Sequence, residues 1–103
     1  MLSFLLSKVK KTYSSPKSFN NHFGLPLSLS NLPANSIYNI FELGMNNKGE
    51  IHNLSKILQP DIGVITNIGP AHLEKLKNIK NIALCKSEII NNIKKNGTIF
   101  LNI

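Results

Sequence analysis

Apolar residues along the chain alternate between two spacings, one typical of buried strands and one typical of amphipathic helices. Continuous β-branched runs predict parallel strands over residues 37–43, 61–67 and 98–103. Helical spacing predicts helices over residues 1–11, from Gly49 or Asn47 to an end marked by Pro60, and from Asn78 to about Lys95. Residues 17–29 suggest an ordered loop that leads into a short helix. Residues 12–16 read as a turn. This order favours an α/β layer structure with a parallel sheet and right-handed crossovers.

The helix predicted from Asn78 carries a lysine on its apolar side. The apolar members of that side recur at helical spacing and are Ile79, Ile82, Ala83, Ile89, Ile90 and Ile93, with Lys86 among them. An unpaired ammonium buried there costs several kcal/mol or more. The side chain therefore either extends to solvent along its stem, pairs with an acid, loses its proton or is chemically modified.

Polar residues follow two of the predicted strands at their carboxyl ends. Ligand crevices in such sheets lie outside these ends, so Glu42, Thr66, Asn67 and His72 are expected at one rim, within reach of Lys86. This group of residues has three possible roles. They are a structural ion pair between Lys86 and Glu42, a metal site with Glu42 and His72, or that metal site with Lys86 converted to a carbamate. Histidine suits Zn²⁺ or Mn²⁺ better than Mg²⁺, and a single histidine is usually structural.

Composition narrows the classes of partner. The net charge of +7 comes from twelve lysines spread along the chain, without arginine, and this argues against nucleic-acid binding. Cys85 is the only cysteine, which excludes an intramolecular disulfide and a thiolate metal cage and favours a reducing, cytoplasmic location. No apolar run approaches the ~18 residues that cross a bilayer, so no membrane partner is expected.

Four stretches resemble successive motifs of the central domain of Mur ligases. They are SFNNHFGLPLS at residues 18–28, ELGMNNKGEI at 42–51, TNIGPAHLE at 66–74 and KSEI at 86–89. Their order matches the family and they cover most of the chain. The resemblance implies that residues 1–103 form part of a three-layer, parallel-sheet central domain of the P-loop NTPase kind, truncated at both ends.

The resemblance also implies a reaction and its site. It implies an ATP-dependent amide ligase of peptidoglycan synthesis whose substrates are UDP-N-acetylmuramoyl-tripeptide, D-alanyl-D-alanine and ATP, with Mg²⁺ as the metal. The implied roles are Mg²⁺ ligation by Glu42, His72 and carbamylated Lys86, catalysis by Lys86, His72 and Asn67, and substrate contacts by Asn20, Asn21, Thr66 and Asn67.

The family's Gly-x-x-Gly-Lys-Thr phosphate loop and its two flanking domains are not found in these 103 residues. We therefore expect a fragment of a longer ligase that has no ligase activity by itself and folds marginally or self-associates, because a partial sheet leaves an edge uncovered. One alternative is a non-catalytic remnant that acts as a binding module. Another is a fragment of a folylpolyglutamate synthetase relative, against which Asn20-Asn21 and Gly49-Glu50-Ile51 argue.

Overall fold

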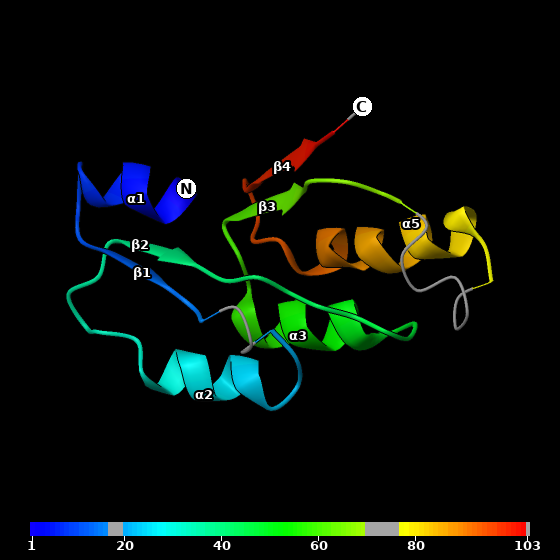
Figure 1. Ribbon diagram of the computed structural model, residues 1–103, viewed down its shortest axis with the longest axis horizontal. Helices are drawn as coiled ribbons and strands as arrows, with labels where there is room; N and C mark the ends of the chain where they lie inside the picture. Colours follow the sequence, from blue (N-terminus) through cyan, green and yellow to red (C-terminus); the bar gives the residue numbers. More distant parts are fainter. Residues whose placement is uncertain (17–19, 70–76, 103) are drawn as a thin grey trace. The chain divides into compact units, whose positions relative to one another are not determined.

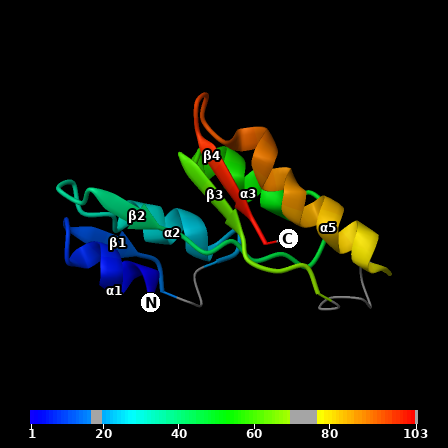
Figure 2. The same cartoon turned by 90° about the horizontal axis from the view of Figure 1, so that it is seen from above.

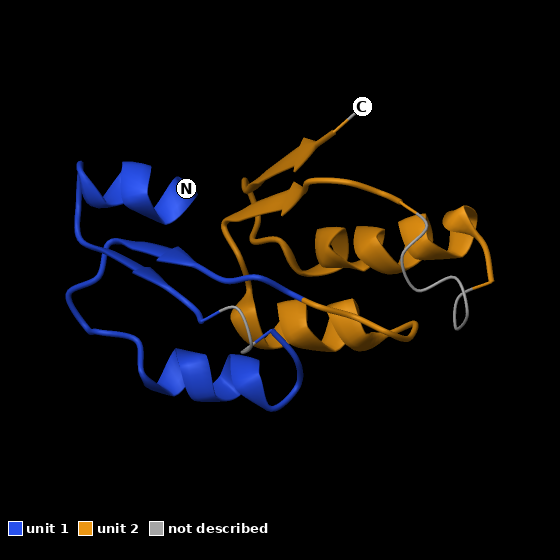
Figure 3. Cartoon of the chain, viewed as in Figure 1, with its two compact units in different colours: residues 1–43 blue, residues 44–103 orange. Residues whose placement is uncertain are grey.

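The computed structural model describes residues 1–16, 20–69 and 77–102. The chain divides into two compact units, residues 1–43 and residues 44–103 (Figure 3). Each unit contains one pair of parallel strands and the helices that accompany it. The predicted α/β class is confirmed, and the described residues hold four strands in two pairs where the sequence predicted three strands. No helix in the described ranges is both long and apolar enough to cross a membrane.

The first unit is a strand-helix-strand crossover preceded by a short helix (Figure 1). Its elements are α1 (Leu2–Ser7), β1 (Thr12–Ser14), α2 (Gly24–Ser30) and β2 (Tyr38–Ile40). β1 pairs in parallel with β2, with Tyr13 opposite Asn39. The Tyr13 hydroxyl lies 2.9 Å from the carbonyl oxygen of Ser28 and 3.0 Å from its Oγ. This contact joins the strand to α2 and gives the fully buried Ser28 side chain a hydrogen-bond partner.

The prediction of a turn over residues 12–16 is wrong, because residues 12–14 form β1. Three residues without an apolar run give little strand signal in a sequence. The strand forms because β2 offers hydrogen-bond partners at both ends. Ile37 N donates to Lys11 O at 2.8 Å, and Ser15 N donates to Ile40 O at 2.9 Å.

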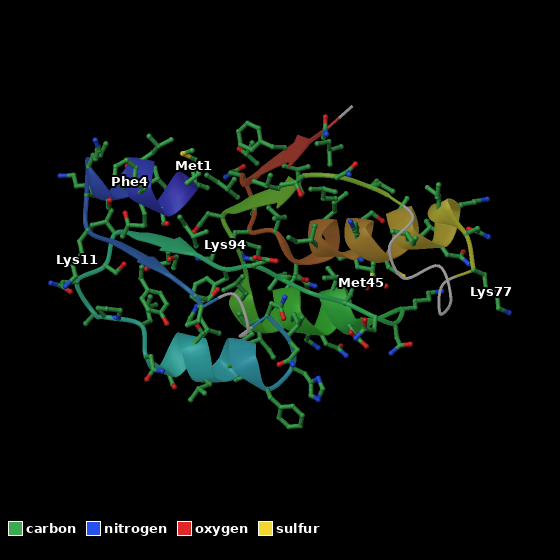
Figure 4. All side chains as sticks on the ribbon, viewed as in Figure 1. Met1, Phe4, Lys11, Met45, Lys77 and Lys94 are labelled. Carbon is green, nitrogen blue, oxygen red and sulfur yellow. The ribbon has the colours of Figure 1, made fainter. Side chains whose placement is uncertain are left out.

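The second unit contains α3 (Glu50–Leu58), β3 (Ile62–Ile65), α5 (Ile79–Ser87), a 3-10 helix η1 (Glu88–Asn92) and β4 (Thr98–Leu101). Figure 2 shows β3 and β4 side by side, and they pair in parallel from Ile62 opposite Thr98 to Ile65 opposite Leu101. α3 contacts both α5 and η1. The buried apolar side chains here are those of Met45 (labelled in Figure 4), Ile51, Leu54, Ile82 and Cys85.

Gly63 lets η1 approach β3 closely. A Cβ atom at this position would lie 2.8 Å from Ile93 Cδ1, 2.9 Å from Ile99 Cδ1 and 3.5 Å from Ile89 Cδ1. The glycine therefore makes room for isoleucine side chains from the segment after α5 and from β4. Ile89 and Ile93 thereby pack near Gly63 of β3.

The prediction of one α-helix with a single apolar side from Asn78 to about Lys95 is wrong in the length of the helix and in the burial of that side. The α-helix ends at Ser87, and the 3-10 helix that follows ends at Asn92. A 3-10 helix turns by about 120° per residue instead of about 100°. Positions after Ser87 therefore leave the α-helical register, and Ile90 is 49% exposed. Ile79 in the first turn is 52% exposed as well.

Candidate functional site

Lys86 lies in the last turn of α5 and reaches the loop that follows β3. Its side chain is half-buried, and Nζ donates a hydrogen bond of 2.6 Å to the backbone oxygen of Asn67. Asn67 comes two residues after Ile65, the last residue of β3. The structure thus brings two of the predicted site residues together at the carboxyl end of a parallel strand.

The loop after β3 is also held from the side of β4. Asn102 Nδ2 donates to Thr66 O at 2.9 Å, and Asn102 N donates to Ile65 O at 3.2 Å. The backbone carbonyls of Thr66 and Asn67 are thereby both engaged, while their side chains are on exposed residues. Exposed polar side chains on an anchored loop suit contact with a ligand.

The structure does not bring the other two predicted metal ligands, Glu42 and His72, together with Lys86 among the described residues. Glu42 follows β2 in the first unit and is exposed, with its backbone N donating to Ser15 Oγ at 3.4 Å. His72 lies outside the described residues. Within the described ranges no three His, Cys, Asp or Glu side chains form a cluster that could hold a metal ion. Glu42 and Lys86 belong to different units, so both their ion pair and their shared metal site stay predictions.

Asn21 has a structural contact that the sequence did not suggest. Its Oδ1 accepts hydrogen bonds from Phe23 N at 3.1 Å and from Gly24 N at 2.8 Å, at the start of α2. Asparagine is a preferred residue at helix starts for this reason, and that preference was the available sequence signal. Asn20 is half-buried in the loop before it. The substrate contacts predicted for Asn20 and Asn21 stay predictions.

Two substitutions separate the capping oxygen of Asn21 from its amide group. Asn21→Ala is expected to lower the free energy of unfolding by about 1 kcal/mol, because two backbone N–H groups lose their acceptor. Asn21→Asp keeps an acceptor oxygen at the helix start and is expected to keep the stability of the parent. Urea denaturation followed by circular dichroism measures both. Equal losses in the two variants would contradict a capping role.

Glu88 is a residue to which the sequence gave no role, although it lies in the fourth motif. Its carboxylate accepts hydrogen bonds from Gly49 N at 3.0 and 3.2 Å and from His52 N at 3.2 Å. Gly49 precedes α3 with a φ of +90°, a conformation that favours glycine. A carboxylate at the amino terminus of a helix is stabilised by the helix dipole. Glu88 therefore joins the end of α5 to the start of α3.

A second polar contact joins η1 to α3 one turn further on. Asn92 Nδ2 donates to His52 O at 3.1 Å and to Ser55 Oγ at 2.9 Å.

The Cys85 thiol has a raised pKa. Burial is the main cause, and the negative charge of Glu88 adds to it. Cys85 therefore stays a neutral thiol at pH 7 and acts as a small core residue.

The chain is similar in sequence to a known protein family and to a ligase of known reaction. The sequence pattern of the Mur ligase middle domain matches residues 1–103. The UDP-N-acetylmuramoyl-tripeptide--D-alanyl-D-alanine ligase of Bacillus subtilis is 40% identical over 99 residues, which are 96% of this chain and 22% of that protein. The chain thus spans about a fifth of the length of this relative.

Solved structures are similar to the chain over nearly all of its residues. A crystal structure of MurF from Acinetobacter baumannii matches with a TM-score of 0.93 at 37% identity, over 97% of this chain and 22% of that one. The MurF ligase from Thermotoga maritima in complex with ADP matches with a TM-score of 0.90 at 33% identity, over 97% and 23% respectively.

Proposed function

This chain belongs to the Mur ligase family, because the middle-domain pattern matches it. We propose that it is part of the ligase that joins D-alanyl-D-alanine to UDP-N-acetylmuramoyl-tripeptide. The names of its relatives support that choice of substrates. The observation that carries the proposal is the Lys86 amine held 2.6 Å from the Asn67 carbonyl, at the strand end where ligands bind in parallel sheets.

The proposed reaction has two steps. The tripeptide carboxylate attacks the γ-phosphorus of ATP, which forms an acyl phosphate and releases ADP. The amine of D-alanyl-D-alanine then attacks the acyl carbon, which forms the amide and releases phosphate and a proton. The ADP bound to the Thermotoga maritima relative is compatible with the first step. Phosphoryl transfer of this kind depends mainly on positioning and on electrostatic stabilisation.

The donor set of this chain suits Mg²⁺ if Lys86 is modified. Glu42 offers a carboxylate oxygen, the kind of ligand that Mg²⁺ prefers, whereas an ammonium is no ligand. A Lys86 amine that has lost one proton adds to CO₂, which forms an N–C bond, releases a second proton and leaves an anionic carbamate. A bound Mg²⁺ would supply positive charge to the transferring phosphoryl oxygens. His72 is proposed as a further ligand.

The chain's own residues would then hold and orient the reactants. The Asn67 carbonyl fixes the direction of the Lys86 side chain, and the loop after β3 is anchored by Asn102. The exposed side chains of Thr66 and Asn67 are proposed to contact substrate, together with Asn20 and Asn21. A cytoplasmic location is part of the proposal, and the free, buried Cys85 thiol is in keeping with a reducing compartment.

A graft tests the proposed function. This chain replaces the matched 99-residue segment of the Bacillus subtilis relative, and ADP release and amide formation are measured with tripeptide and dipeptide. We expect the graft to form the amide and the isolated 103-residue chain to release no ADP above the blank. The relative without its matched segment is the control. A folded graft that binds ATP without forming the amide would contradict the proposal, as would ligase turnover by the isolated chain.

A further inference from the structure

The junction between α5 and η1 is held from two sides. On one side, Lys86 Nζ donates to Asn67 O at 2.6 Å. On the other, the Glu88 carboxylate accepts from Gly49 N and His52 N at the start of α3. Residues two apart in a helix are separated by about 200° around its axis, so they lie on nearly opposite faces. One short segment is thus fixed against a loop and against a helix at once.

We propose that Glu88 is a positioning residue for Lys86, which it holds toward Asn67 by anchoring the end of α5 to the first turn of α3. The catalytic value of this anchor rests on the proposed function, whereas the anchor itself does not. The segment between the two residues is where α-helical geometry gives way to 3-10 geometry, at Ser87 and Glu88. Fixing Glu88 there sets the rotation of the last α-helical turn and so the direction in which Lys86 leaves it.

Three properties make Glu88 a strong anchor. Its carboxylate receives two backbone N–H groups, and hydrogen bonds to a charged acceptor are roughly twice as strong as neutral ones. The acceptor lies at a helix amino terminus, where the dipole favours negative charge. Glu88 is half-buried, which reduces screening by salt. The same contacts engage the amides of Gly49 and His52, so this helix start is occupied by the chain's own carboxylate.

Anchoring matters for a lysine more than for a shorter side chain. The Lys86 amine stands at the end of four methylene groups, so a small rotation of its backbone moves Nζ over a large arc. Misplacing a reacting group by about 1 Å costs about a hundredfold in rate. A contact that fixes the backbone at residue 88 therefore has its effect at the end of the residue 86 side chain.

Reductive methylation of lysines with formaldehyde and a borane reductant, followed by peptide mass spectrometry, tests the anchor in the 103-residue chain. We expect Lys86 to react about fivefold more slowly than Lys94, because Lys86 is a half-buried residue whose Nζ donates a hydrogen bond of 2.6 Å, whereas the Lys94 side chain is 53% exposed and holds an ion pair of 3.5 Å with the exposed Asp61. In Glu88→Ala, which leaves Gly49 N and His52 N without this acceptor, the Lys86 rate is expected to rise to that of Lys94. The Lys94 rate is expected to stay unchanged.

Asn92→Ala is the matched control, because it removes a second polar contact between η1 and α3 and leaves Glu88 in place. It is expected to keep Lys86 protected. Loss of protection in both variants to the same extent would overturn the proposal, and so would unchanged protection in Glu88→Ala. If circular dichroism shows that Glu88→Ala does not fold, Glu88→Asp, whose shorter side chain withdraws the carboxylate, takes its place under the same criteria.

The grafted ligase supplies a second readout, with kcat expressed per folded molecule because partial unfolding lowers the apparent kcat without changing KM. Glu88→Ala is expected to lower this kcat about tenfold while KM for the tripeptide stays the same, because only the placement of the Lys86 side chain changes. A rise in KM with unchanged kcat would overturn the positioning role. Failure of the graft itself to form the amide would instead reject the proposed function, and the methylation rates would still decide the anchor.

Discussion

Lys86→Gln in the grafted ligase is expected to lower kcat by about a thousandfold, the upper range for removal of one preorganised electrostatic group. Glutamine keeps a polar side chain of similar size near the Asn67 carbonyl, but it carries no amine that can become a carbamate. The loss should therefore reach the phosphoryl-transfer step itself. ADP release at saturating substrates measures kcat, and circular dichroism shows whether the variant stays folded.

Lys80→Gln is the control for this substitution, because Lys80 is an exposed lysine in the first turn of the same helix. It is expected to keep kcat within about twofold of the parent, as surface substitutions usually have little effect. A kcat for Lys86→Gln within about tenfold of the parent would contradict a catalytic role of Lys86, even though the motif around it resembles that of the family.

Chemical rescue of Lys86→Ala distinguishes a carbamate from a free amine. Small carboxylates such as acetate are expected to restore part of kcat, because they return anionic oxygens to the space left by the side chain. Ethylamine is expected to restore none. The reverse result would show that the lysine acts as an ammonium. Carbon-13 NMR of the 103-residue chain in labelled bicarbonate adds a direct check, since a carbamate signal should be absent from Lys86→Gln.

Local patterns predicted much of the fold because they report on local physics. The apolar runs predicted β3 and β4, and Pro60 marked the end of the helix that the structure places at Glu50–Leu58. β1 was missed because it has three residues and gains its hydrogen bonds from β2, which lies far along the sequence. The 3-10 segment was missed because helical spacing does not reveal a change of pitch within one apolar stretch.

The candidate site, like the fold, was only partly predictable from the sequence. Lys86 was detectable because a charge on the apolar side of a helix breaks a local period, and the structure gives its amine a partner in the loop after β3. The role of Glu88 was not detectable, because its partners Gly49 and His52 lie 39 and 36 residues away and no local spacing connects them. Family membership, by contrast, followed from four motifs in order, and the match over residues 1–103 confirms it.

Gly97 lies where an added Cβ atom would meet backbone atoms closely. The turn between η1 and β4 is tied to the start of β3, since Lys94 N donates to Pro60 O and Thr98 N donates to Asp61 O, both at 3.0 Å. A Cβ atom at Gly97 would lie 2.5 Å from Asp61 O, 2.5 Å from Ile93 Cγ2 and 2.8 Å from Lys94 O. Two of these three neighbours are backbone atoms, which cannot move without breaking the turn.

Gly97→Ala is therefore expected to lower the free energy of unfolding by about 3 kcal/mol, the upper end for overpacking. This is a large part of the roughly 5–15 kcal/mol that holds a typical domain folded. Urea denaturation of the 103-residue chain measures the loss. Gly69→Ala is the matched control, because among the described residues its new Cβ would meet only Asn67 Nδ2, at 3.6 Å, and it is expected to change stability by less than about 0.5 kcal/mol. Equal stabilities of the two variants would show that the turn at Gly97 relaxes, and that β4 is not held at β3 by this close approach.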